Sequence, residues 1–147
     1  MAIAQDLSGR FVRFVLCDQS RTKHVGHDPL QPAGIRLQPA RYPLTWGHRG
    51  YVIGFCFWVM LHPKGERVNA PDFVEGDCII GVAELFDSKL ADLAWTGLAR
   101  HLFTHTCAVL NQKPEDPFGS GDLVEIALVS EAEAACPGAR VLKTWEA

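Results

Sequence analysis

Residues 87–110 read DSKLADLAWTGLARHLFTHTCAVL, and this stretch decides the fold because its periodicity changes part-way along. The first part has the three- and four-residue spacing of one helical face. The positions on that face are Leu90, Leu93, Ala94, Leu98, His101 and Leu102. Asp87 or Ser88 can cap the first turn, because a short side-chain oxygen accepts from the free backbone N–H groups there. We therefore expect a helix that packs its leucines against a sheet.

Residues 104–110 are rich in β-branched and apolar side chains and are too short for a second helix, so they predict a strand. Further segments of this kind are residues 11–16, 50–61, 77–86, 122–129 and 140–145, and Gly54 predicts a bulge within the second of them. Regular helices do not separate these strands. The sequence therefore predicts an α+β, mainly β fold: a small antiparallel β-barrel or twisted sheet with one main packed helix.

Composition narrows the classes of function. The chain of 147 residues is expected to form one domain, and 48% of its residues are hydrophobic. A net charge of −3 without a lysine or arginine run argues against nucleic-acid binding. The most apolar run, residues 51–61, is far shorter than the roughly 20 residues of a membrane span, and the N-terminus does not resemble a signal peptide. Five scattered cysteines without a C-x-x-C motif indicate reduced thiols in a cytoplasmic product, and no cofactor is predicted.

Residues 18–40 are polar and contain Pro29, Pro32 and Pro39, which predicts a long loop. Loops of this length in compact domains are usually functional or held by a partner. We expect the region 18–45 to act as a partner-docking arm.

Glu125 interrupts the apolar segment 123–129. Strand alternation would place it on a solvated face with Leu123 and Ala127. The alternative is a carboxylate kept inside because it orients an imidazole. His48 lies just before the strand at 50–61, after a tryptophan, which permits a catalytic role for it.

Four segments, in order, resemble the prohead maturation proteases of tailed bacteriophages. PLTWGHRGYVIG resembles that family's "PLLWQHD…PIG" segment, and GDCIIGVAELFDSKLADLAW resembles "GLYVEGRLFDTPLA". TCAVL takes the place of the "GLSIGF" strand that supplies the serine nucleophile. LVEIALVSEAEAACPGARVL resembles a closing "EVSLV" strand followed by "PANPGARV". The resemblance covers residues 42–141 and implies a fold similar to that of the herpesvirus assemblins.

Carried over residue by residue, the resemblance implies that His48 is the general base and Glu125 the third, orienting member of a triad. The nucleophile position departs from the family, because alignment puts Thr106 there and a one-residue slip puts Cys107 there. The extra methyl of a threonine crowds the path of attack, and a cysteine in a buried strand is usually inert.

A metal site is a competing interpretation. His101, His105 and Cys107 are close in sequence and are ligands that zinc accepts. The two histidines share a helical face only if the helix continues through residue 105, which the predicted strand opposes. His24, His27 and Asp28 lie in the proline-rich loop and are interpreted as a solvated cluster.

The resemblance implies a role in a phage head, and two functions follow from it. The first is a catalytically inactive structural or decoration protein, present in the virion and in the host cytoplasm during assembly. It would bind the major capsid protein or other head proteins as a homo-oligomer or symmetric array. The second is a working maturation protease that cleaves scaffold or coat protein through Thr106 or Cys107. Loss of a triad nucleophile lowers the rate about 10⁶-fold, which favours the first. A β-rich binding module remains a third interpretation.

Overall fold

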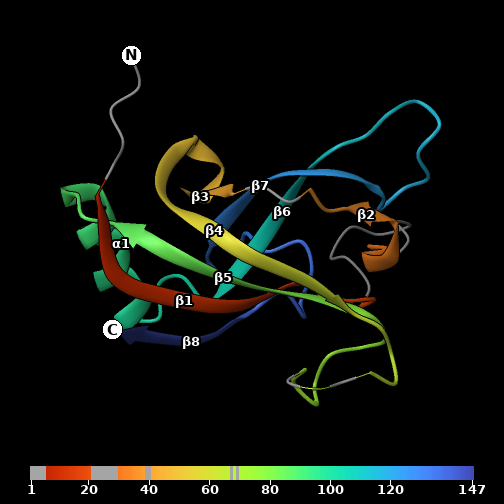
Figure 1. The fold of residues 1–147 in the computed structure, drawn as a ribbon, viewed down its shortest axis with the longest axis horizontal. Coiled ribbons are helices and arrows are strands. Elements are labelled where there is room, and N and C mark those ends of the chain that lie inside the picture. Colours follow the sequence, from red (N-terminus) through yellow and green to blue (C-terminus); the bar gives the residue numbers. More distant parts are fainter. Residues whose placement is uncertain (1–5, 21–29, 39–40, 67, 69) are drawn as a thin grey trace.

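The computed structural model describes residues 6–20, 30–38, 41–66, 68 and 70–147, and of His48 it describes the backbone alone. The elements in chain order are β1 (Leu7–Cys17), η1 (Pro32–Gly34), β2 (Ile35–Arg36), β3 (Tyr42–Trp46), η2 (Gly47–Arg49), β4 (Tyr51–His62), β5 (Cys78–Phe86), α1 (Lys89–Ala99), β6 (His105–Asn111), β7 (Gly121–Val129) and β8 (Val141–Glu146). The strands form one twisted sheet, and α1 lies at the end of the sheet where β5 finishes (Figure 1).

The sheet is mixed. Its strand order is β2–β7–β3–β4–β5–β1–β8, with β6 also paired to β7. Five pairs are antiparallel, as the sequence predicted, but β2 and β3 both run parallel to β7. The mainly β, α+β fold class is therefore confirmed, with antiparallel pairs predominating and two parallel pairs that the sequence did not indicate. Both parallel pairs involve the short strands β2 and β3, which the sequence had not predicted.

The sheet curls but stays open. Val141 N donates to Thr104 O at 3.0 Å, and Thr106 N donates to Ala139 O at 3.0 Å. His105 and Arg140 form an isolated antiparallel bridge. These contacts join the start of β6 to the start of β8 without the continuous ladder of a closed barrel.

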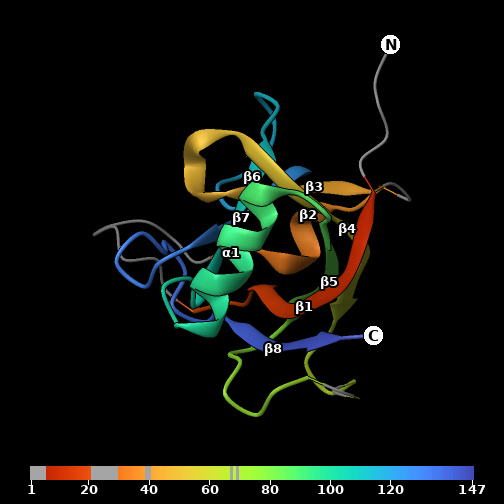
Figure 2. The same ribbon diagram turned by 90° about the vertical axis from the view of Figure 1, so that its left-hand side faces the viewer.

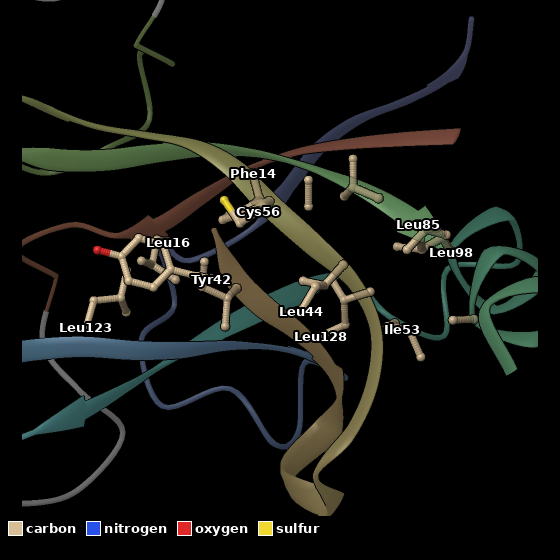
Figure 3. Close-up of a cluster of buried hydrophobic side chains, with 14 of the residues drawn as sticks. Phe14, Leu16, Tyr42, Leu44, Ile53, Cys56, Leu85, Leu98, Leu123 and Leu128 are labelled. Atoms are coloured by element: carbon tan, nitrogen blue, oxygen red, sulfur yellow. The ribbon is translucent and has the colours of Figure 1, made fainter. Parts of the chain in front are cut away.

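The main core lies between β1, β3, β4, β5 and β7, with α1 against one end (Figures 2 and 3). The side chains with no exposed surface include Phe14, Leu16, Leu44, Ile53, Leu85, Ile126 and Leu128. Gly54 carries the predicted irregularity, because the pairing with β3 shifts register between Val52 and Gly54. A Cβ at Gly54 would lie 2.3 Å from Glu84 O, so the close approach of β4 and β5 requires glycine there.

The helix begins where the sequence predicted, but the face that it packs against the core is rotated from the predicted one. Ser88 is the N-cap, and its hydroxyl accepts from Ala91 N at 3.2 Å. The buried residues of the helix are Ala91, Ala94, Gly97 and Leu98. Leu93 is 59% exposed and Leu102 is 61% exposed, so their predicted packing against the sheet is wrong. The small side chains at 91, 94 and 97 allow close approach to the core, which favours this face over the leucine-rich one.

The helix ends in a Schellman motif with histidine in the position that usually holds glycine. Leu102 N donates to Gly97 O at 2.8 Å, and His101 N donates to Leu98 O at 3.1 Å. His101 has φ of 59°, in the left-handed region. A side chain there is strained, because its Cβ crowds the following carbonyl. His101 therefore lies beyond the helix and does not share a helical face with His105.

Two leucines of α1 test the rotated face. Leu98→Ala should lower the free energy of unfolding by about 2–5 kcal/mol, because it leaves a cavity in the core. Leu93→Ala should change it by less than about 0.5 kcal/mol, because that side chain is mostly in solvent. Urea denaturation followed by circular dichroism measures both. Equal losses for the two variants would contradict the observed orientation of the helix.

The left-handed residue gives a second prediction. His101→Gly should raise the free energy of unfolding by about 0.5–1 kcal/mol, because glycine adopts this conformation without strain. Arg100→Gly is the matched control: its φ is −93°, and glycine there should destabilise by up to about 1 kcal/mol. A stabilised R100G or a destabilised H101G would be inconsistent with the motif.

Candidate functional site

The predicted triad segments lie on three neighbouring strands. Trp46 of β3 pairs with Leu128 of β7, and Leu128 pairs with Thr106 of β6. The backbone of His48 lies in η2, directly after β3. Strands are about 4.8 Å apart, so the end of β3 and Thr106 are separated by roughly two strand spacings. The side chain of His48 is not among the described ones, and its contact with residues 106–107 stays a prediction.

Glu125 is held by a threonine that the sequence analysis missed. Thr45, at 1% exposure, donates its hydroxyl to Glu125 Oε2 at 2.8 Å. The carbonyl oxygens of Gly47 and Ile126 lie 3.2 and 3.4 Å from the same hydroxyl. The bond ties the half-buried carboxylate to the strand end that leads into η2. A hydroxyl at the end of a strand, two residues before a glycine, is too common a pattern to have indicated this contact.

A bulge sets the direction of Leu123. The pairing of β6 with β7 shifts register between Val109 and Leu110, which leaves Val124 as the extra residue of β7. Leu123 therefore returns to the core beside Ile126 and Leu128. The solvated face that simple alternation predicted for Leu123 and Ala127 is wrong, because both side chains are buried.

Thr106 and Cys107 point to opposite faces of β6. Thr106 has no exposed surface, and its hydroxyl donates to Val15 O at 2.9 Å. Cys107 is opposite Ala127 and packs with Val129 and Ala134. Directly paired residues share a face, so Cys107 lies on the face that carries Glu125, and Thr106 lies on the other.

Neither predicted nucleophile is open to substrate in this conformation. The Thr106 hydroxyl is used in a buried hydrogen bond to β1. Cys107 is 8% exposed, and its Sγ is 4.0 Å from Glu133 O in the loop between β7 and β8. An attack on a peptide carbonyl by Cys107 would first require this loop to move.

All five cysteines are free and buried. Burial raises the pKa of the Cys56 thiol to about 12 and raises those of Cys17 and Cys136 as well. The thiolate is the reactive form, so these three thiols are poor nucleophiles at neutral pH.

The histidines of the alternative metal site are separated. His101 is exposed in the turn after α1, whereas His105 is buried in β6 with Nδ1 2.8 Å from the Thr104 hydroxyl. In the described part of the chain, no three histidine, cysteine, aspartate or glutamate side chains are grouped as metal ligands. His24, His27 and Asp28 lie outside the described residues.

A buried polar cluster at the end of β1 was also missed by the sequence analysis. Asp18, at 1% exposure, accepts hydrogen bonds from Ser20 N, the Ser20 hydroxyl and Glu75 N, and from Cys136 Sγ at 3.4 Å. A Cβ at Gly138 would lie 2.0 Å from Asp18 Oδ2. Both carboxylate oxygens are used, so the cluster joins three segments of the chain and leaves no oxygen for a ligand.

Comparison of the chain with protein-family models, with curated protein sequences and with solved structures gave no match. No helix in the described ranges has the length and hydropathy of a membrane span.

Thiol reactivity tests whether Cys107 is enclosed. In the folded protein at pH 8, iodoacetamide should modify Cys107 at least about 100-fold more slowly than in urea, because reaction requires the structure to open. Cys56 is the internal reference, since burial raises its pKa to about 12. Mass spectrometry of peptides follows both residues. Selective modification of Cys107 in the folded protein would show an accessible thiol.

Proposed function

We propose that this chain is a catalytically inactive relative of the phage prohead proteases that serves as a structural or decoration protein of the phage head. In this role it binds the major capsid protein or another head protein, as a homo-oligomer or symmetric array in the virion. It does so without cleaving scaffold or coat protein.

The proposal rests on the burial and the hydrogen bonding of Thr106. The residue has no exposed surface, and its hydroxyl donates to Val15 O of β1 at 2.9 Å. A nucleophile needs a free path to the substrate and a neighbouring base. Thr106 has neither among the described side chains, and its role in this structure is to join β6 to β1.

The arrangement of the strands supports the link to the protease family. The segments that resemble the family's histidine, nucleophile and closing strands are β3 with η2, β6 and β7. β7 pairs with both of the others. Adjacent strands of this kind would bring the three triad segments together in an active protease and in an inactive relative alike.

The region 18–45 is only in part available as a docking arm. Asp18, Ser20, Pro32 and Ile35 are buried, and β2 and β3 belong to the sheet. Deletion of residues 20–38 would therefore remove packed structure. Residues 21–29 lie outside the described part of the chain, and a test of docking is best confined to residues 22–28.

The experiment compares particles made with Thr106→Ala and Cys107→Ala. Both variants should yield heads with coat protein of unchanged mass, and the chain should be present intact and in fixed stoichiometry in mature particles. Replacing residues 22–28 by a glycine–serine segment of equal length should release the protein from particles.

Thermal unfolding of the purified variants is the control for folding. Uncleaved scaffold or coat protein in either alanine variant would identify a working nucleophile and overturn the proposal. Absence of the unmodified chain from particles would exclude a head protein.

A further inference from the structure

A pocket of about 340 Å³ lies on the sheet away from the predicted triad. It is lined by Leu7, Phe11, Arg41, Phe55, Phe57 and Glu84. The neighbouring residues Val12, Ala83 and Leu85 are buried in the core, so the pocket is on the opposite face of β1 and β5. Its volume falls in the range of small-molecule and side-chain binding sites.

The register of three strands places a carboxylate between aromatic rings. Glu84 of β5 pairs with Phe11 of β1 on one side and with Phe55 of β4 on the other. Phe57 joins them because it is two residues after Phe55 on β4, and alternate residues of a strand share a face. Phe57 is 49% exposed, and its ring centroid lies 6.1 Å from that of Phe11, edge to face.

Glu84 is fixed in position by a backbone hydrogen bond. Its Oε2 accepts from Gly9 N at 2.8 Å, which orients the half-buried carboxylate. Among the described residues, no lysine, arginine or histidine forms an ion pair with it. A carboxylate among apolar groups is stabilised by a cation that replaces lost water.

The aromatic row that contains Phe11 already accepts an ammonium group. Phe11 stacks on Trp145 of β8 with centroids 5.3 Å apart. Lys143 Nζ lies 5.6 Å from the centroid of Trp145. The faces of aromatic rings carry partial negative charge and attract cations within about 6 Å. On the other side of Phe11, the pocket combines aromatic rings with the carboxylate of Glu84.

We propose that this pocket receives a lysine side chain presented by a partner protein. The ammonium group binds Glu84, and the alkyl stem packs against Phe11, Phe55 and Phe57. Arg41, which also lines the pocket, is exposed and repels the incoming charge, which weakens binding. The inference does not depend on the phage-head assignment, because it uses only residues of the pocket.

Titration with small probes of different charge tests whether the pocket prefers a cationic side chain. The probe is Nα-acetyl-lysine N-methylamide, titrated into ¹⁵N-labelled protein, with backbone amide shifts in β1, β4 and β5 as the readout. The norleucine analogue has nearly the same shape without the charge, and the glutamate analogue reverses the charge. The lysine probe should bind with millimolar affinity, at least about fivefold tighter than norleucine, and more weakly at high salt.

Variants locate the interaction. Glu84→Gln keeps an acceptor for Gly9 N and should weaken binding of the lysine probe about fivefold, whereas Arg41→Gln should strengthen it about twofold. Phe57→Leu keeps apolar area without the ring and should weaken it about twofold to fivefold. Glu115→Gln, in the exposed turn between β6 and β7, is the matched control and should have no effect.

Three results would overturn the inference. Equal affinities for the lysine and norleucine probes would indicate a purely apolar groove. Preferential binding of the glutamate probe, lost in Arg41→Gln, would indicate an anion site. If the protein is folded and 50 mM lysine probe shifts no amide signal in the pocket, the pocket does not bind lysine with the affinity expected of an exposed cation–π contact.

Discussion

The pairing of β7 with β6 and β3 is the constraint on which the arrangement of this protein depends. Each direct pair in a sheet shares a face, so this one strand decides which residues of its neighbours meet. It sends Thr106 to the core with Leu128 and leaves Cys107 opposite Ala127. It also holds β3 parallel, which brings the segment of His48 to the same end of the sheet as the start of β6. The buried bond from Thr106 to Val15 then fastens this group of strands to β1.

Asp18, Glu125 and Glu84 differ in what their surroundings leave free. Asp18 accepts from four donors and is saturated, so it acts as a structural joint. Glu125 accepts from Thr45 and is half-buried, which suits a group that positions something else. Glu84 is oriented by one backbone N–H and lies among aromatic rings, and no described side chain forms an ion pair with it. Burial alone does not distinguish these roles. They depend on how many hydrogen-bond donors each carboxylate already has.

Much of the fold follows from sequence periodicity, and the exceptions have physical causes. Strands β1, β4, β5, β6, β7 and β8 and the cap at Ser88 were predicted, because apolar runs and a short polar cap are local signals. β3 was missed because it is five residues long, contains Pro43 and follows a proline-rich loop. The helix face was misjudged because packing depends on close approach: Ala91, Ala94 and Gly97 lie nearer the core than Leu93 could. Composition does not report such distances.

For the candidate site, the sequence predicted which segments carry the residues but not where their side chains point. His48, Thr106 and Glu125 could be assigned to segments that the fold brings onto adjacent strands, but the direction of each side chain depends on register. One extra residue at Val124 turns Leu123 from the face that simple counting implies, and one residue of difference sends Thr106 into the core and Cys107 to the face that carries Glu125. A triad requires that all its members point to one place. The opposite orientation of Thr106 and Cys107 means that only Cys107 shares a face with Glu125, and that thiol is covered by the loop after β7. Any proteolysis through Cys107 would have to open that loop before chemistry, which supports the proposed binding role over catalysis.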